Sequence, residues 1–523
     1  MKKLPISIQD FETLITRDCV YVDKTRHIYK MVTEGMSYFL SRPRRFGKTL
    51  LVSTLENLFA GKKELFKGLW IEQADWDWTP HPVLRIDFNG ISFGTPEILH
   101  QSLMEDLHSK SKKFEVALET SSLRNRFKEL IVKVFEKHRQ KVVVLVDEYD
   151  QPLISHLGKG EATLEIAKQN REVLREFYGV LKEGEANQAL QFVFITGISK
   201  FAKMSIFSEL NNLKDLTMHP AYALLLGYAQ EELEAFLGDW IQKLSADKNE
   251  SYQEVLDKLK KWYNGYRFTR ENILVYNPVS VLNALEQEIF DTYWFETATP
   301  FFLVNLIKEQ QYPVPLIETL ELSQQDFTVY DLDYLKLEPL LFQTGYITIK
   351  NYEEELYQLS YPNQEVKTSF LSHLYEHMVT IRDSSLKAQY KKLHLYLRQE
   401  QIDLLIETAN AILSAIPYEH IDDQDEHYYH TVFYLMLSAS GVLVHTEVLS
   451  VQGRVDMEVH FSDKVYIVEL KCNQSAEQAI AQIKAKKYFE KHLHSGRKII
   501  LLGINFDTSE RCIKDWQVEI LES

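Results

Sequence analysis

The first half of the chain alternates short apolar runs with amphipathic stretches. Apolar runs occupy 38–40, 83–86, 142–146 and 192–195, and residues at helical spacing fill 50–55, 98–107 and 130–135 between them. Buried parallel strands give near-continuous apolar runs, whereas helices that pack on a sheet give a period of 3.6 residues. This order predicts an α/β fold, a doubly wound parallel sheet with helices on both faces.

The second half changes pattern several times. Residues 228–307 are mostly helical, and 316–349 indicate a helix, a turn and then a strand, as in a small winged-helix-like module. A long helical stretch follows over about 366–415. Beyond it, the runs 453–461 and 465–471 alternate apolar and polar residues around a short polar turn, which predicts a β-hairpin. Ser475 and Gln478 form a helix-start signal directly after the hairpin.

Composition and charge limit the class of protein. The 523 residues are 45% hydrophobic and 26% charged, which is typical of a soluble globular protein, and the net charge of −16 argues against a uniformly basic nucleic-acid binder. Cys19, Cys472 and Cys512 are too few and too scattered for a disulfide framework or a zinc cluster. The start of the sequence lacks the apolar core of a signal peptide, and no run reaches membrane-spanning length. We therefore expect a cytoplasmic protein without a membrane partner.

Residues 41–49, Ser-Arg-Pro-Arg-Arg-Phe-Gly-Lys-Thr, lie between the first apolar run and a helical pattern. Gly47, Lys48 and Thr49 match the end of the phosphate-binding loop, in which backbone N–H groups face phosphates, lysine bridges them and the hydroxyl holds Mg²⁺. The general motif has glycine five residues before Gly47, whereas this chain has Arg42. A chance tripeptide in a basic loop is the alternative, so the context must decide.

The apolar run 142–146 supplies that context, because it ends in Asp147 and Glu148. A parallel strand delivers such carboxylates to the C-terminal edge of the sheet, where Asp147 would hold Mg²⁺ and Glu148 would polarise the attacking water. The alternative is that the acids only cap the next helix. Thr196, on a strand expected between the two motif strands, is a candidate γ-phosphate sensor, with a plain turn as the alternative. The predicted ATP site of this P-loop NTPase domain comprises Arg45, Phe46, Gly47, Lys48, Thr49, Asp147, Glu148 and Thr196.

Two charged segments outside these motifs are further candidates. Asp23 and Lys24 lie near a bound nucleotide or, more simply, form a surface turn. Arg267 is a candidate to reach a phosphate from a helical lid, with a solvent-facing or ion-paired arginine as the alternative.

A second candidate site lies in the predicted hairpin. Glu469 and Lys471 are two apart on one strand and share a face, and a hairpin centred between Ser462 and Asp463 places Asp456 opposite Glu469. Facing carboxylates are destabilising unless a cation lies between them, and a divalent metal with hard oxygen ligands fits this role. Lys471 would orient and deprotonate a water molecule. The alternative is a surface hairpin whose acids pair with Arg454 and Lys471.

Flanking residues support the metal site. Glu426 and His430 share one face of a predicted helix, and Gln482 follows the hairpin on another. This helix, meander and helix indicate a restriction-endonuclease-like α/β domain. Seven Lys/Arg against three Glu between 465 and 500 favour a phosphodiester substrate, although a solvated helix face explains the charges equally well.

The chain resembles bacterial AAA-ATPase-like proteins fused to a PD-(D/E)XK nuclease-superfamily domain, abundant in Bacteroidetes. The stretches that carry the resemblance are Tyr21-Val-Asp-Lys-Thr25, the loop 42–49, Val146-Asp-Glu-Tyr-Asp150, Trp262-Tyr-Asn-Gly-Tyr-Arg267, Gly453-Arg-Val-Asp456 and Glu469-Leu-Lys471. The family's own loop begins with arginine. The resemblance implies that Lys48 and Thr49 bind phosphate and Mg²⁺, that Asp147 and Glu148 serve hydrolysis, and that Asp456, Glu469 and Lys471 form a nuclease triad with Glu426 and Gln482 as accessories.

We predict four domains: a P-loop AAA-ATPase-like domain over 1–225, a helical lid over 226–310, a winged-helix-like module with a helical linker over 311–400, and a nuclease-like domain over 401–523. The leading hypothesis is an ATPase whose nucleotide state controls a nuclease that uses Mg²⁺ or Mn²⁺ and acts on nucleic acid in defence or mobile-element biology. The competing hypothesis is a STAND-like signalling switch, in which ATP drives assembly of a homo-oligomer and the C-terminal domain binds without cutting. A third hypothesis is a nucleotide-binding scaffold with negligible turnover.

Overall fold

The computed structural model describes residues 1–200, 212–294, 301–310, 312–327, 336–379, 389–415, 426–450 and 453–521. For 301–302, 378–379, 426–427, 447–450 and 453–454 it describes the backbone alone. These residues form two compact units, one made of 1–306 with 321–365 and the other of 307–320 with 366–523. The division into four domains stays a prediction.

The first unit is built on a parallel sheet of five strands in the order β2-β3-β4-β1-β5. The strands are β1 (Ser37–Ser41), β2 (Val83–Asp87), β3 (Val142–Asp147), β4 (Leu190–Gly197) and β5 (Lys214–Asp215). All six residues of β3 are buried, as expected for a central strand covered on both faces. The predicted parallel sheet is confirmed, and β4 lies between the two strands that carry the motifs.

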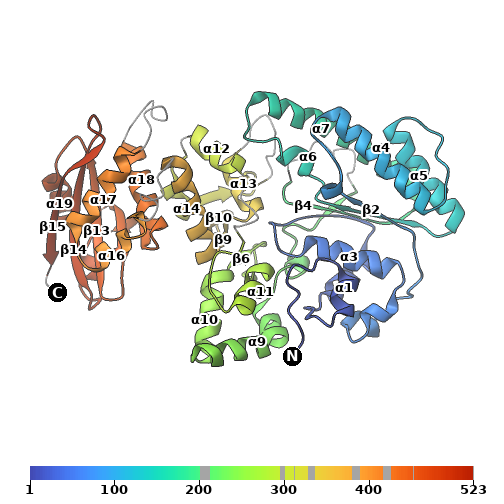
Figure 1. Cartoon of the computed structure of the whole chain (residues 1–523), viewed down its shortest axis with the longest axis horizontal. Coiled ribbons are helices and arrows are strands. Elements are labelled where there is room, and N and C mark those ends of the chain that lie inside the picture. The colour runs from blue at the N-terminus through green and yellow to red at the C-terminus, as the bar shows by residue number, and fades with distance from the viewer. Residues whose placement is uncertain are drawn as a thin grey trace. The chain divides into compact units, whose positions relative to one another are not determined.

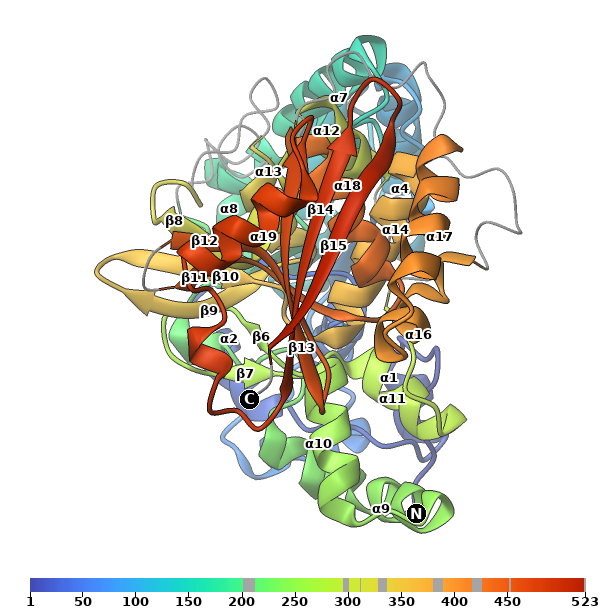
Figure 2. The ribbon, with the colours of Figure 1, turned by 90° about the vertical axis from the view of Figure 1, so that its left-hand side faces the viewer.

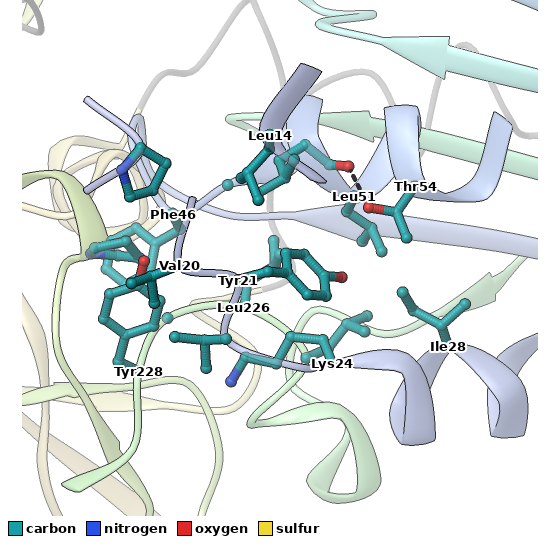
Figure 3. A pocket seen from close by; sticks show the side chains of 17 residues that line it. Leu14, Val20, Tyr21, Lys24, Ile28, Phe46, Leu51, Thr54, Leu226 and Tyr228 are labelled. Carbon is teal, nitrogen blue, oxygen red and sulfur yellow. Dashed lines mark hydrogen bonds between the residues drawn. The ribbon is translucent and has the colours of Figure 1, made fainter. Parts of the chain in front are cut away.

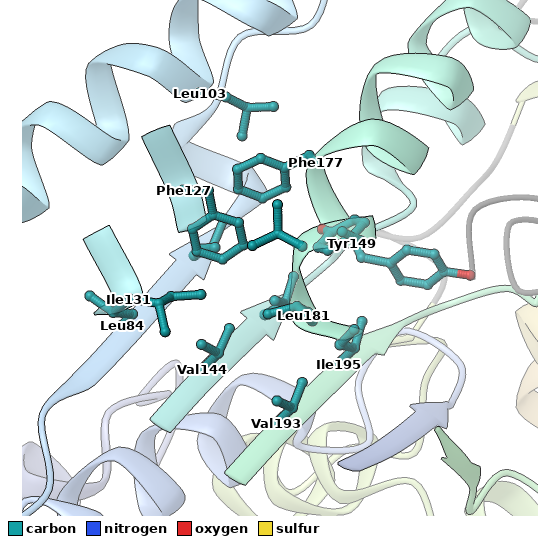
Figure 4. Close-up of a cluster of buried hydrophobic side chains, with 14 of the residues drawn as sticks. Leu84, Leu103, Phe127, Ile131, Val144, Tyr149, Phe177, Leu181, Val193 and Ile195 are labelled. Carbon is teal, nitrogen blue, oxygen red and sulfur yellow. The ribbon is translucent and has the colours of Figure 1, made fainter. Parts of the chain in front are cut away.

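Helices cover both faces of this sheet (Figure 1). On one side lie α1 (Phe11–Thr16) and α3 (Lys48–Phe59), and on the other α4 (Pro96–Lys113), α5 (Leu123–His138), α6 (Gln151–Ile154) and α7 (Glu161–Gly179), with α2 (Thr25–Glu34) and α8 (Gly184–Ala189) beside them. Figure 4 shows the core on the second side, where the stacked rings of Phe127 and Phe177 lie over Val144 and Ile195. This core fixes the strand ends that carry the candidate site.

Three helices form a separate core in the first unit: α9 (Gln230–Lys248), α10 (Tyr252–Tyr263) and α11 (Pro278–Gln287). Ser251 and Glu254 begin α10 with a reciprocal capping box. The hairpin β6 (Tyr266–Arg267) and β7 (Leu274–Val275) follows α10. A small sheet in the order β8-β10-β9 completes this region, with β8 (Leu320–Ser323), β9 (Thr348–Glu353), β10 (Leu356–Ser360) and the helix α13 (Leu337–Thr344).

The second unit contains a mixed sheet in the order β11-β12-β13-β14-β15, in which only β13 and β14 pair in parallel. Its strands are β11 (Leu443–Ser450), β12 (Gly453–His460), β13 (Lys464–Cys472), β14 (Lys498–Asp507) and β15 (Cys512–Leu521). Figures 1 and 2 show α19 (Ala476–Ala485) on one side of this sheet and α17 (Ile402–Ser414) and α18 (Glu426–Ala439) on the other. The predicted hairpin is β12–β13, and its mixed sheet confirms the predicted fold class.

The described residues contain further helices. The other helices are α12 (Phe301–Glu309), α14 (Gln364–Val379) and α16 (Leu393–Arg398). Short 3-10 helices lie at η1 (Lys63–Phe66), η2 (Trp70–Gln73), η3 (Phe88–Gly90), η4 (Val180–Lys182), η5 (Pro220–Tyr222), η7 (Val314–Thr319) and η9 (Glu490–His492). No helix in the described ranges is both long and apolar enough to span a bilayer.

Candidate nucleotide and metal sites

The loop that joins β1 to α3 presents a helix N-terminus. α3 begins at Lys48, directly after Gly47, whose φ of 94° is a left-handed conformation that favours glycine. The first N–H groups of a helix have no partner within it, so this end is suited to an anion. The Lys48 ammonium is nearly buried, and it donates to the carbonyl oxygens of Arg42 at 3.1 Å and Pro43 at 3.3 Å.

Asp147 and Glu148 lie beside this loop. Glu148 Oε1 is 3.5 Å from Lys48 Nζ, and the Glu148 backbone has a left-handed φ of 54°. Asp147 is fully buried, and neither of its carboxylate oxygens has a well-aligned hydrogen-bond partner among the described residues. Burial and the neighbouring Glu148 raise the pKa of Asp147 to about 6, and Lys48 and Thr49 oppose this rise. A buried oxygen ligand beside the Thr49 hydroxyl fits the chemistry of Mg²⁺.

Tyr149 and Asp150, the next two residues of the motif, form hydrogen bonds to the segment that follows β4. Asp150 precedes α6, but its side chain makes no capping bond to that helix. Instead its carboxylate accepts hydrogen bonds from the backbone N–H groups of Ile198 and Ser199 and from the Ser199 hydroxyl. The Tyr149 hydroxyl donates to the Ser199 carbonyl oxygen at 2.8 Å. Tyr149 and Asp150 therefore hold the chain where it leaves β4, close to the end that Thr196 occupies.

The structure also places the weaker candidates. The Thr196 hydroxyl donates to the Leu40 carbonyl oxygen at 2.8 Å, and its role as a phosphate sensor stays a prediction. The Arg267 guanidinium donates to the backbone carbonyl oxygens of Thr269, Arg270 and Lys350, so it holds the β6–β7 hairpin to β9. Lys24 is not a surface residue, because it is 8% exposed and pairs with Glu232 on α9 at 2.5 Å.

A pocket opens beside Gly47 (Figure 3). Val20, Tyr21, Phe46, Leu226 and Tyr228 give it a largely apolar lining, and Lys24 is also part of its wall. The sequence analysis missed this pocket, although Tyr21 and Lys24 belong to a stretch that carries the resemblance.

The second candidate site lies at the end of the β12–β13 hairpin. The pairs of this hairpin run from His460 with Val465 to Met457 with Val468, and Asp456 and Glu469 are the next residues of the two strands. Asp456 accepts a hydrogen bond from the Leu470 N–H at 2.8 Å, and Lys471 Nζ is 3.0 Å from Glu469 Oε1. The sequence-predicted carboxylates and lysine therefore lie together. The side chain of Arg454, the alternative partner of these acids, lies outside the described residues.

Glu469 is 1% exposed, and its Oε2 atom has no hydrogen-bond partner within the described part of the chain. Burial and the nearby Asp456 raise the pKa of Glu469 to about 7, whereas Lys471 and His430 lower it. Two close carboxylates, one with an unpartnered buried oxygen, fit a hard divalent cation such as Mg²⁺ or Mn²⁺. Among the residues described, however, no group of three His, Cys, Asp or Glu side chains is arranged to hold a metal.

Residues on both flanking helices reach this site. Gln482 on α19 donates a hydrogen bond to Glu469 Oε1, as expected for an accessory residue. His430 on α18 lies 3.4 Å from Asp456 Oδ2, a contact that the sequence analysis missed although it placed His430 on the face of Glu426. The side chain of Glu426 lies outside the described residues, so its accessory role stays a prediction.

Comparisons with known proteins match an N-terminal and a C-terminal segment of the chain. Residues 5–207 match a family model described as predicted AAA-ATPase, and residues 424–516 match the PD-(D/E)XK nuclease superfamily. A protein of Azotobacter chroococcum mcd 1, called uncharacterized protein in vnfD 5'region, is 36% identical over 532 residues that cover 99% of each chain. The two matched segments contain the two candidate sites.

Proposed function

Because this chain belongs to the family of AAA-ATPase-like proteins that carry a C-terminal PD-(D/E)XK nuclease-superfamily domain, we propose that it binds and hydrolyses ATP and cleaves nucleic acid with a divalent metal. One observation supports the proposal most strongly. Each matched segment contains buried carboxylate oxygens that lack a well-aligned hydrogen-bond partner in the described structure, at Asp147 and at Glu469. Such oxygens are costly to bury unless a cation or a donor arrives to satisfy them.

At the first site, Lys48 and the N–H groups at the start of α3 bind the phosphates. Thr49 and Asp147 would hold Mg²⁺, which when bound neutralises phosphate charge. Glu148 orients the attacking water and takes its proton, because its carboxylate lies 3.5 Å from the Lys48 ammonium that binds the phosphates. The pocket lined by Phe46, Tyr21 and Tyr228 receives the base, since its apolar walls suit a flat aromatic ring.

At the second site, Asp456 and Glu469 would hold Mg²⁺ or Mn²⁺, which when bound polarises the scissile phosphate. Lys471 orients the attacking water from 3.0 Å beside Glu469, and Gln482 fixes the Glu469 carboxylate. His430 on α18 steadies Asp456, which lies 3.4 Å away. The water oxygen attacks phosphorus, the bond to the leaving oxygen breaks, and the proton that the water loses is released to solvent.

The local charge gives limited support for a nucleic-acid substrate. Five of the seven basic residues between 465 and 500 pair with carboxylates in the structure: Lys471, Lys484, Lys487, Lys491 and Lys498. Lys486 is exposed one helical turn beyond Gln482, where it would meet a phosphodiester backbone near the metal site. The proposal therefore rests on the carboxylate pair more than on the basic rim.

A cleavage assay tests the proposal. Purified protein should cut single- or double-stranded DNA or RNA when Mg²⁺ or Mn²⁺ is present, and Asp456→Ala and Lys471→Ala should each abolish cutting while MgATP binding is unchanged. Lys514→Ala is the matched control, because this lysine pairs with Asp507 at another turn of the domain. Cutting that survives both site variants would overturn the nuclease assignment.

A further inference from the structure

Arg42 occupies the position at which the general phosphate-binding loop has its first glycine, and its side chain is only 1% exposed. Its Nη1 group donates to the carbonyl oxygens of Ser41 at 3.0 Å and Thr217 at 2.5 Å. Its Nε and Nη2 groups have no hydrogen-bond partner among the described residues. Burial lowers the pKa of Arg42 to about 9, which Asp215 opposes. Burying a guanidinium that lacks some of its hydrogen bonds costs free energy of folding. We therefore expect another contact to offset part of this cost.

The compensating contact comes from the hairpin that follows α10. The guanidinium carbon of Arg42 lies 4.2 Å from the ring centroid of Phe268, a cation–π distance. The same ring meets Phe46, near the other end of the loop, edge to face at 5.4 Å, and Tyr266 meets Phe46 at 4.8 Å. A single aromatic ring therefore contacts both the first and the fifth residue of the six-residue loop 42–47.

Other residues hold the middle of the loop from the same side. The Trp294 indole N–H donates to the Arg44 carbonyl oxygen at 2.9 Å. A side chain at Gly345 would meet Pro43 at 2.7 Å, so the backbone of α13's last turn approaches the loop closely. The loop has one glycine, Gly47, and Arg45 is held at a φ of 133°, which side-chain-bearing residues rarely adopt. Packing, not glycine content, sets the conformation of this loop.

We infer that Arg42 and Phe268 are positioning residues for the nucleotide: their stacking fixes the loop so that Gly47 and Lys48 are preorganised for phosphate. The inference rests on the proposed ATP site and deepens it. Fixing a loop in its bound conformation lowers the cost of binding without touching the ligand. The coupling is reciprocal, so a bound nucleotide in turn stabilises the hairpin that carries Phe268.

The test is a titration of MgADP and of a non-hydrolysable MgATP analogue into wild-type protein and Phe268→Leu. We expect the variant to raise Kd about tenfold for both nucleotides, equal to about 1.4 kcal/mol, and to leave kcat at saturating ATP within about twofold. A residue that only stabilised the fold would lower Tm without this separation of Kd from kcat. Phe290→Leu is the control, because Phe290 stacks on Tyr263 and packs against the core formed by α9, α10 and α11.

Two further measurements make the test independent of one variant. Arg42→Lys keeps the charge but not the planar stacking group, so it should raise Kd in the same direction. In wild-type protein, MgADP should slow hydrogen–deuterium exchange over 264–268. If wild-type protein binds the nucleotides but neither Phe268→Leu nor Arg42→Lys changes Kd, this inference is wrong while the proposed ATP site stands. The same conclusion follows if MgADP leaves the exchange of 264–268 in wild type unchanged. A wild-type protein that binds neither nucleotide would overturn the proposed ATP site as well.

Discussion

Replacing Glu148 with glutamine separates binding from hydrolysis at the first site. The substitution keeps the size of the side chain and removes its charge and its capacity to accept the proton of water. In the free protein Glu148 lies 3.5 Å from Lys48 Nζ, and the two side chains are 14% and 4% exposed. The carboxylate therefore competes with phosphate for the same ammonium.

The structure sets the scale of this competition. At 3.5 Å and an effective dielectric constant of about 20, the Coulomb attraction is about 5 kcal/mol before desolvation and rearrangement are counted. If removing the Glu148 charge makes about a fifth of that attraction, about 1 kcal/mol, available for binding phosphate, the Kd for MgATP falls about fivefold. Loss of a general base lowers the hydrolysis rate by roughly 10²- to 10⁴-fold. Glu148→Gln should thus bind ATP at least as tightly as wild type while almost all turnover is lost.

Two assays measure the two effects. Fluorescence or calorimetric titration gives Kd, and continuous detection of released phosphate gives the rate at saturating MgATP. Glu161→Gln, at the exposed start of α7, is the control and should change neither quantity. Equal phosphate release from wild type and Glu148→Gln would refute the role given to Glu148, and would favour a nucleotide-binding scaffold with negligible turnover.

Two further variants test the first unit. Lys48→Ala should raise the Kd for MgATP by at least about 30-fold, because it removes a charge-assisted phosphate contact, and an unchanged Kd by calorimetry would contradict the site. Burial raises the pKa of Glu365 from 4.5 to about 7, so the native state keeps a proton that the unfolded chain releases. The free energy of unfolding of wild type therefore falls as the pH rises from about 4.5 to about 7. Glu365→Gln should remove this dependence, worth up to about 3 kcal/mol. A difference in Tm between the two proteins that is the same at pH 5 and pH 8 would contradict it.

Sequence periodicity was sufficient to predict the parallel sheet and the register of the β12–β13 hairpin. Strand β3 is buried on both faces, so its sequence is one apolar run that ends where Asp147 leaves the sheet. In the hairpin, side chains alternate between faces, and counting from the turn predicted the register in which His460 pairs with Val465 and Met457 with Val468. Local rules of this kind need no information from distant parts of the chain.

Contacts between distant segments could not be predicted in the same way. The pocket beside Gly47 is assembled from 20–28, the loop and 225–228, and only the folded chain brings these together. The burial of Arg42 is equally invisible in the sequence, because arginine is normally exposed and its partner Phe268 lies far along the chain. The contact of His430 with Asp456 depends on how α18 packs on the sheet, which helical periodicity alone does not fix.

The central claim is that two separate carboxylate sites on this chain hold divalent metal, and crystallography can locate the metal directly. Crystals grown with Mn²⁺ and a non-hydrolysable ATP analogue should give two anomalous difference peaks, one beside Thr49 and Asp147 and the other beside Asp456 and Glu469. Well-ordered density for all four side chains with no manganese peak at either pair would contradict the account.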